Sequence, residues 1–237
     1  MINSTNTVCI TGASRGIGRI LAHAFSILGF PLILTARSID HLSKVKKECF
    51  EAGSPQVEMV EVDFLADNPL RELDNLQSKP SILINNAGDF LFKNLQDSTD
   101  QDYINQFSVN ALGTIRVTDY LMPVLGSQKQ ALIVNICSKA SVVGYDDASA
   151  YSVSKHALYG YGKALRAHLK QAAPHVACTN ILLGQTLSTS WDGLYVDHEL
   201  LIDPVDVAEL IIGLTKLGTR TVVEELTIMP SKGELSR

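Results

Sequence analysis

A tyrosine and a lysine four positions apart are the residues of this sequence best suited to moving a proton. Tyr151 and Lys155 stand in the run Tyr-Ser-Val-Ser-Lys, inside a stretch with a helical pattern. Residues at this spacing lie on one face of a helix, one turn apart. A phenol has a pKa of about 10, and a neighbouring ammonium group favours the phenolate and so lowers such a pKa. Tyr151 is therefore a candidate general acid or base, with Lys155 as its activator.

Such a pair suits the interconversion of a carbonyl and an alcohol. Hydride addition to a ketone leaves an alkoxide, which a tyrosine hydroxyl can protonate. A second hydrogen-bond donor to that oxygen would lower the barrier further. Ser138 is the candidate donor, because it directly follows the apolar run 130–137. By itself, a tyrosine four residues before a lysine is also explained by simple packing of the ring beneath the lysine side chain. Whether the pair is catalytic therefore depends on what else the chain binds.

A glycine-rich turn near the amino terminus predicts a phosphate-binding site. It follows the apolar run 7–11 and leads into a helical pattern. Glycine permits a tight turn and close backbone approach, and the N–H groups and positive dipole end of a helix attract a pyrophosphate. The glycines are spaced GxxxGxG and so do not match the general dinucleotide-binding pattern GxGxxG. The alternative interpretation is a glycine-rich turn that binds no ligand. The predicted cofactor-binding residues are Gly12, Ser14, Arg15, Gly16, Ile17 and Gly18.

The end of the second predicted strand favours NADP over NAD. An NAD site usually carries an acid there, about 20 residues after the glycines, to bind the ribose 2′-hydroxyl. This chain has Ala36 followed by Arg37. Together with Arg15, Arg37 is predicted to bind a 2′-phosphate through paired guanidinium hydrogen bonds. The alternative is that both arginines are ordinary surface residues. Asp40, a further candidate for the ribose acid, is interpreted as a helix cap, with Ser38 as the alternative cap of the same helix.

The elements that must position these residues follow the pattern of repeated βαβ units. We predict a single α/β domain over residues 1–237. Its fold is expected to be of the Rossmann type, a doubly wound parallel sheet of seven strands flanked by helices. The predicted strands are 7–11, 31–36, 57–62, 81–85, 130–137, 175–182 and 224–229. The predicted helices are 16–28, 40–52, 69–77, 100–125, 150–173 and 204–217. Asp203 followed by Pro204 predicts the start of the helix at 204. The stretch 184–203 lacks clear periodicity, which is typical of a lid or binding loop.

The composition argues against several classes of function. A chain of 237 residues that is 46% hydrophobic can bury one large core. Its net charge of −5 and lack of a basic block predict no nucleic acid or anionic membrane as a partner. Four widely spaced cysteines are interpreted as free thiols, and neither a signal peptide nor a membrane span is evident, so we expect a cytoplasmic protein. No grouping has metal-ligand spacing.

These motifs together resemble the short-chain dehydrogenase/reductase family, in the family's order, from about Thr7 to Pro230. The resemblance is carried by the turn from Thr11 to Gly18, Asp63, Asn85-Asn86-Ala87-Gly88, Asn110, Ser138, and Tyr151 with Lys155. It implies an NADP-dependent, carbonyl-reductase-like oxidoreductase acting on a carbonyl or alcohol.

The resemblance also implies roles on the adenosine side of the cofactor. Asp63 is expected to accept a hydrogen bond from the adenine amino group, and Asn86, Ala87 and Gly88 to line the adenosine. Without the family, Asp63 would be interpreted as a loop or cap carboxylate.

On the nicotinamide side, Asn110 is expected to hold a water in a proton relay that ends at Lys155. Tyr151 and Lys155 are expected to contact the cofactor as well, Lys155 through the ribose hydroxyls. Without the family, Asn110 would be a helix residue bonding locally to the backbone. The family commonly has Pro-Gly after the sixth strand, where this chain has Leu183-Gly184. Gly184 and Thr186 are expected to meet the nicotinamide amide.

The substrate is expected to be a small carbonyl or alcohol compound. Aromatic residues that suit it lie in the 184–203 loop and after Gly88 and Ser138, namely Phe90, Phe92, Tyr145, Trp191 and Tyr195. The loop has no basic cluster for an acidic carrier, so general carbonyl reduction is favoured over 3-oxoacyl-carrier reduction. A catalytically silent NADP-binding sensor and a scaffold without ligand are the rivals from other classes. Helices 100–125 and 150–173 resemble those through which family members pair, so a homo-oligomer, tetramer or dimer, is expected.

Overall fold

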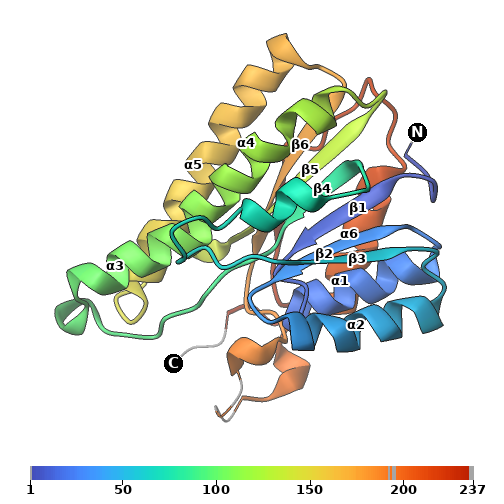
Figure 1. The fold of residues 1–237 in the computed structure, drawn as a ribbon. Helices are drawn as coiled ribbons and strands as arrows, with labels where there is room; N and C mark the ends of the chain where they lie inside the picture. Colours follow the sequence, from blue (N-terminus) through green and yellow to red (C-terminus); the bar gives the residue numbers. More distant parts are fainter. Residues whose placement is uncertain (1, 192, 194–195, 235–237) are drawn as a thin grey trace.

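The computed structural model describes residues 2–191, 193 and 196–234, and it contains the predicted parallel sheet (Figure 1). Its strands are β1 Thr7–Thr11, β2 Leu32–Ala36, β3 Val57–Glu61, β4 Pro80–Asn85, β5 Ala131–Ser138, β6 Val176–Leu183 and β7 Glu225–Ile228. Every boundary lies within one residue of the predicted one. The strand order is β3-β2-β1-β4-β5-β6-β7, with all neighbours parallel. The order reverses between β1 and β4, and doubly wound sheets bind ligands beyond the strand ends at such a point.

Helices cover both faces of the sheet (Figure 1). One layer contains α1 Gly16–Ile27, α2 Ile39–Ala52 and α6 Pro204–Thr215; the other contains α3 Asp100–Phe107, α4 Gly113–Gly126 and α5 Ser149–Ala172. Successive strand residues face opposite sides. Accordingly, Val8 and Ile10 of β1 belong to the core beneath α1, whereas Cys9 belongs to the core beneath α4. Burial on both faces explains why the strands read as continuous apolar runs.

Two predicted helices differ in the structure. The 69–77 stretch forms only a short 3₁₀ helix, Arg71–Asn75, in which Leu73 is the one buried residue. An α-helix needs a longer apolar stripe to pack on the core. The predicted helix 100–125 is interrupted by a π-helical turn, Ser108–Leu112, between α3 and α4. Such wide turns are rare and occur often at functional sites.

The helix caps confirm the predicted start of α6 and decide between the two candidate caps of α2. Asp203 caps α6, with its Oδ1 accepting the Val205 N–H at 2.8 Å and Pro204 as the first helical residue. At α2 the cap is Ser38, whose Oγ accepts the His41 N–H at 3.3 Å. Of the two predicted candidates, Ser38 is therefore the cap and Asp40 is not. Asp40 lies in the first turn, where its carboxylate interacts favourably with the helix dipole.

A row of buried asparagines joins the strands that carry the site. Asn85, Asn135 and Asn180 are in register on β4, β5 and β6. The Asn85 Nδ2 donates to the Asn135 Oδ1 at 2.9 Å, and the Asn135 Nδ2 donates to the Asn180 Oδ1 at 3.0 Å. These bonds offset the cost of burying amides. A Cβ at Gly162 would come 2.1 Å from the Asn180 Oδ1, so Gly162 lets α5 approach β6 closely.

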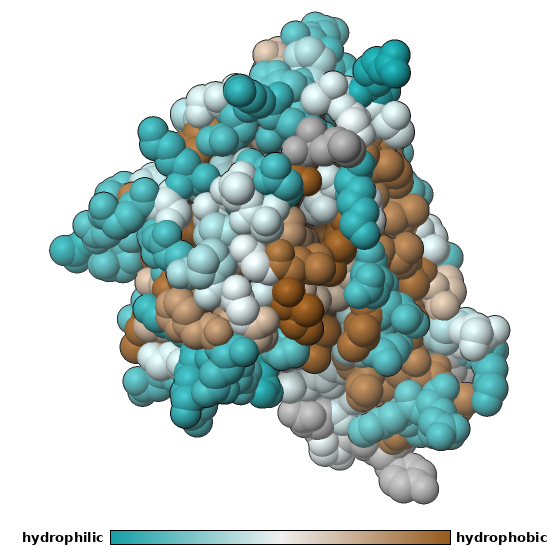
Figure 2. Space-filling view, turned by 90° about the vertical axis from the view of Figure 1, so that its right-hand side faces the viewer, coloured by the Kyte–Doolittle hydropathy of each residue, from teal (hydrophilic) through white to brown (hydrophobic). Residues whose placement is uncertain are grey.

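The surface is mixed in character. One side of the molecule shows a band of apolar residues between hydrophilic ones (Figure 2). Large apolar side chains that are exposed include Ile27 on α1 and Val153 on α5. Within the described residues, no helix combines the length and hydropathy needed to cross a membrane. All four cysteines are buried free thiols.

Candidate active site

A cavity of about 790 Å³ lies where the carboxyl ends of β1, β2, β4, β5 and β6 meet the following loops. Most predicted site residues line it, namely Gly12, Ser14, Arg15, Gly16, Ile17, Arg37, Asp63, Asn86, Ala87, Gly88, Ser138, Tyr151, Lys155, Gly184 and Thr186. Gly18 and Asn110 are buried and do not belong to the described lining of the cavity. The structure thus brings together residues separated by more than 170 positions in the sequence.

The phosphate turn has a backbone that only glycine adopts comfortably. Gly12 and Gly16 have φ of +65° and +54°, in the left-handed region that other residues avoid. A Cβ at Gly12 would come 2.7 Å from the Ala87 Cα, and one at Gly18 would come 2.3 Å from the Gly12 carbonyl oxygen. The Asn86 Nδ2 braces the turn by donating to the Gly12 carbonyl at 3.1 Å.

The start of α1 fits an anionic group. Its N-cap, Arg15, makes no side-chain capping bond, and the first turn contains no acid. The first N–H groups of a helix have no partner within the helix, and they attract anions. A phosphate matches this end by charge and by hydrogen bonding.

Two arginines line the same cavity, one at the start of α1 and one just beyond the end of β2. Arg15 and Arg37 both line it, as do Ser38 and His41. Ser38 and His41 were not predicted as site residues. Their position just after Arg37 could have marked them as site residues. Ser38 was instead explained by its place at the start of a helix. Asp63 also lines the cavity, and its Oδ1 accepts the Leu65 N–H at 3.0 Å.

Tyr151 is held between a cation and an aromatic ring. The Lys155 Nζ lies 5.7 Å from the centroid of the Tyr151 ring. The ring also packs edge-to-face against Phe90, with centroids 4.9 Å apart and planes at 84°. Lys155 is 5% exposed and donates to the Ile136 carbonyl of β5 at 3.0 Å. The predicted pairing on one helix face is therefore present, and a bond to β5 fixes the position of the cation.

Ser138 occupies the end of β5, as predicted. Its Oγ accepts the Ala140 N–H at 3.1 Å, and its own N–H donates to the Ser141 Oγ at 3.2 Å. Because the Oγ accepts this bond, its proton is left to bond to another acceptor. Ser138 and Tyr151 line one cavity, so both hydroxyls are available to a ligand there.

Asn110 sits at the centre of a buried network that spans the π-helical turn. Its Oδ1 accepts the Asp89 N–H at 2.7 Å, and its Nδ2 donates to the Gln106 Oε1 at 3.0 Å and the Ser154 Oγ at 2.9 Å. Ser154 donates in turn to the Tyr151 carbonyl at 2.7 Å. Asn110 does bond to backbone, because its Nδ2 also donates to the Asp89 carbonyl at 2.9 Å, but Asp89 lies 21 positions away in the loop between β4 and α3. The interpretation of its backbone bonding as local is therefore wrong. Gln106 and Ser154 were missed because no motif marks them.

The 184–203 loop closes over the phosphate turn. The Leu187 N–H donates to the Ile202 carbonyl at 3.0 Å, which ties its two ends together. The Trp191 Nε1 donates to the Thr186 carbonyl at 2.9 Å. A Cβ at Gly16 would lie 3.5 Å from the Thr189 Oγ1, so the loop and the turn are in contact.

The aromatic residues predicted to face the substrate divide into two groups. Phe90, Tyr145 and Trp191 line the cavity. Phe92 does not line it and is 53% exposed. Tyr195 lies outside the described residues.

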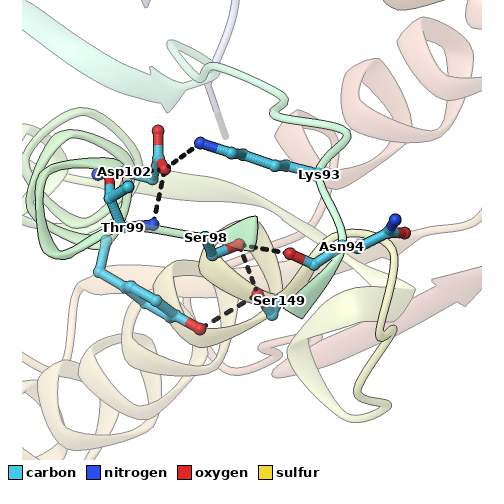
Figure 3. A network of polar contacts seen from close by, with 7 residues as sticks. Lys93, Asn94, Ser98, Thr99, Asp102 and Ser149 are labelled. Carbon is cyan, nitrogen blue, oxygen red and sulfur yellow. Dashed lines mark hydrogen bonds and ion pairs between the residues drawn. The ribbon is translucent and has the colours of Figure 1, made fainter. Parts of the chain in front are cut away.

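A second polar network fixes the start of α5 (Figure 3). The Ser149 Oγ is 3.1 Å from the Ser98 Oγ and accepts the Tyr103 hydroxyl at 3.1 Å. Lys93 pairs with Asp102 at 2.7 Å. The Lys93 ammonium, together with Thr99, holds the pKa of Asp102 at about 2. Ser149 stands two residues before Tyr151, so the network anchors the turn of α5 that carries the tyrosine.

The hydroxyl pair in this network should contribute measurably to stability. We expect Ser149→Ala and Tyr103→Phe each to lower the free energy of unfolding by about 1 kcal/mol, a typical value for one lost hydrogen bond. The double variant should cost less than the two single changes together, because they remove the same bond. Urea unfolding of the four proteins measures this. Additive losses would show that the bond contributes nothing.

Comparisons with known proteins agree with this geometry. A family model described as short chain dehydrogenase matches residues 6–197. Mouse dehydrogenase/reductase SDR family member 7 is 34% identical over 76% of this chain, and the chain spans only 55% of that protein. Sepiapterin reductase of Chlorobaculum tepidum is 28% identical over 95% of this chain and 96% of its own.

A solved structure shares the fold. The alcohol dehydrogenase from the archaeon Thermococcus sibiricus, complexed with 5-hydroxy-NADP, superimposes with a TM-score of 0.87 at 23% identity, over 98% of this chain and 100% of that one. The family model covers most of the chain, including the turn, the tyrosine–lysine pair and all of the cavity lining except Glu234. The chain belongs to the short-chain dehydrogenase family.

Proposed function

We propose that this protein is an NADP(H)-dependent oxidoreductase that interconverts a small carbonyl compound and its alcohol. The observation that carries the proposal is a single cavity with an anion-binding turn at one end and Tyr151, Lys155 and Ser138 at the other. A dinucleotide is long enough to extend from a phosphate site to a reaction site. Family membership supports the same class of reaction.

The residues fit NADP(H), which would supply or accept the hydride when bound. Gly12, Gly16 and the start of α1 would hold the pyrophosphate, and Arg15 and Arg37 the 2′-phosphate. Asp63 would hold the adenine end, with Asn86, Ala87 and Gly88 beside the adenosine. Gly184 and Thr186 would meet the nicotinamide amide. The archaeal alcohol dehydrogenase of similar fold is complexed with an NADP derivative.

At the reaction end, the chain's own residues would manage the proton. The Tyr151 hydroxyl donates a proton to the carbonyl oxygen during reduction and accepts it back during oxidation. The buried Lys155 ammonium, 5.7 Å from the centroid of the Tyr151 ring, would place a positive charge beside the reacting oxygen. Ser138 donates a hydrogen bond to the same oxygen. Asn110, through Gly88 and Ser154, holds the Lys155 side of the site in place.

Arg37→Ala should change the preference between cofactors. We expect it to weaken NADPH binding about 10- to 100-fold, the value of a lost charge-assisted hydrogen bond to phosphate. NADH affinity should change little, because NADH lacks the 2′-phosphate. Titration of the fluorescence of each reduced cofactor gives both dissociation constants. Equal losses for the two cofactors would contradict the assignment of NADP.

The rival functions make different predictions in one assay. An active reductase consumes NADPH over a panel of aldehydes, ketones and diketones. A silent sensor binds NADPH tightly without turnover, and a scaffold does not bind it. A 3-oxoacyl-carrier reductase would prefer a carrier-linked 3-oxoacyl thioester to every free carbonyl in the panel, and that result would replace general carbonyl reduction.

We also propose a cytoplasmic homo-oligomer, a dimer or tetramer. The buried free thiols are consistent with a reducing compartment. The helices expected to pair, α3, α4 and α5, expose apolar side chains, including Ile104, Phe107 and Val153. Light scattering of the purified protein measures the number of subunits.

A further inference from the structure

An acidic wall stands beside the reaction end of the cavity. It is formed by Tyr145, Asp146, Asp147 and Glu234, all of which line the cavity; we call it the Tyr145 wall. The Tyr145 hydroxyl donates to both carboxylate oxygens of Glu234, at 3.2 Å each. Burial, Glu234 and Asp147 raise the pKa of Tyr145 to about 12, with a smaller contribution from Tyr151. The charges of the wall therefore act close to the proposed proton donor.

The fold holds this wall in place by backbone bonds. The Lys93 N–H donates to the Asp147 carbonyl at 2.8 Å, and the Leu95 N–H donates to the Asp146 carbonyl at 2.7 Å. The Tyr145 N–H donates to the Ser152 Oγ of α5 at 3.2 Å. Lys93 is itself anchored by Asp102 in the network of Figure 3. The 145–147 part of the wall is thus preorganised, which reduces the cost of ordering it around a ligand, and the Tyr145 hydroxyl joins Glu234 to it.

Charge is distributed unequally along the cavity. Among the described lining residues, the end at the glycine turn contains the cations Arg15 and Arg37 and a single carboxylate, Asp63. The reaction end contains the three carboxylates of the Tyr145 wall and Asp89, whose Oδ2 accepts the Gln106 amide at 2.8 Å. Lys139 and Lys155 are the cations there, and Lys155 is held by β5. The reaction end therefore has an excess of negative charge among the described lining residues.

We propose that the Tyr145 wall selects carbonyl substrates that carry a cationic group, and disfavours anionic ones, with Glu234 as the specificity-determining residue. The aromatic face of Tyr145 and the carboxylate behind its hydroxyl both attract a cation. A carboxylate, sulfonate or phosphate in the same place would face like charges. This inference rests on the proposed function for the identity of the site, but it concerns the substrate alone.

Three benzaldehydes of similar shape test the inference. They are 4-(trimethylammonio)benzaldehyde, its uncharged counterpart 4-tert-butylbenzaldehyde, and anionic 4-carboxybenzaldehyde. Binding is measured to the protein saturated with NADP⁺, which cannot reduce them, so no turnover is needed. Trp191, the only tryptophan of the chain, lines the cavity and reports binding by its fluorescence.

The wild-type protein should bind the cationic aldehyde at least about four-fold more tightly than the neutral one, the effect of one charge pair near the surface. The anionic aldehyde should bind most weakly. Glu234→Gln should remove most of this preference, and adding Asp147→Asn should remove the rest. Glu209→Gln, at an exposed position of α6, changes the net charge by the same amount and should leave the preference for the cationic aldehyde unchanged. The preference should also shrink in high salt.

Equal binding of the three aldehydes, or no binding of the cationic one, would overturn the inference. So would a preference that survives in the Glu234→Gln, Asp147→Asn double variant. Turnover of NADPH with the neutral aldehyde is measured separately. If no NADPH were consumed, the proposed function would be contradicted. The relative affinities of the NADP⁺ complex for the three aldehydes would still show whether the Tyr145 wall selects by charge.

Discussion

Tyr151→Phe should lower kcat for carbonyl reduction by about 10²- to 10⁴-fold, the usual contribution of a positioned general acid. The substitution removes only the hydroxyl, so the ring can keep its contacts with Phe90 and Lys155. NADPH affinity should stay within a few-fold of the wild type, because most of the proposed cofactor contacts lie elsewhere in the cavity. Steady-state kinetics and NADPH titration measure the two effects.

Tyr120→Phe is the matched control for this experiment. The Tyr120 hydroxyl donates to the Asp74 carboxylate at 2.6 Å, on the surface and away from the cavity lining. This variant should keep full activity. If Tyr151→Phe kept full activity as well, Tyr151 would not be the proton donor, and a water or another side chain would have to replace it.

Gly18→Ala should disrupt the phosphate turn from behind. The added Cβ would come 2.3 Å from the Gly12 carbonyl oxygen and 2.5 Å from the Asn86 Nδ2. Backbone must therefore move, and overpacking of this kind costs about 1–3 kcal/mol of stability. Because Gly12 lines the cavity, NADPH affinity should fall more than about ten-fold. Thermal unfolding and NADPH titration give the two values.

Gly213→Ala provides the control for adding a methyl group. Gly213 lies within α6, and a Cβ there meets nothing within 4 Å. Replacing a helical glycine by alanine stabilises a protein by about 0.5–1 kcal/mol. Gly213→Ala should therefore unfold at a higher temperature and bind NADPH normally. Unchanged NADPH affinity in Gly18→Ala would mean that the turn does not need this close packing.

The sequence predicted the sheet well because its strands are buried on both faces. Continuous apolar runs such as 32–36 are read easily, and the glycine turn gives the first crossover a distinct start. The 69–77 stretch was harder, because a few apolar residues imitate helical spacing without a face that packs on the core. The π-helical turn was also missed, and the bonds of Asn110 within it join segments that lie far apart in the sequence.

The site was predicted where local spacing determines geometry. Tyr151 and Lys155 share a helix face, so their relation follows from the chain itself. Glu234 and Tyr145 are 89 positions apart, and only the folded chain brings them together. Gly18 was expected to bind the cofactor, and it is absent from the described cavity lining; a side chain there would meet the carbonyl of the first glycine in the turn. The spacing of the glycines shows that space is needed at this position, but it does not show which neighbour needs that space.

The central claim is that a hydride moves between NADPH and a carbonyl carbon in this cavity. NADPH deuterated at C4 of the nicotinamide, on one face or the other, tests it most directly with a carbonyl that the protein turns over. We predict an alcohol with one deuterium on its carbinol carbon from only one of the two labelled cofactors, detected by mass spectrometry. An unlabelled alcohol from both cofactors, or tight NADPH binding with no alcohol formed from any carbonyl in the panel, would contradict the claim.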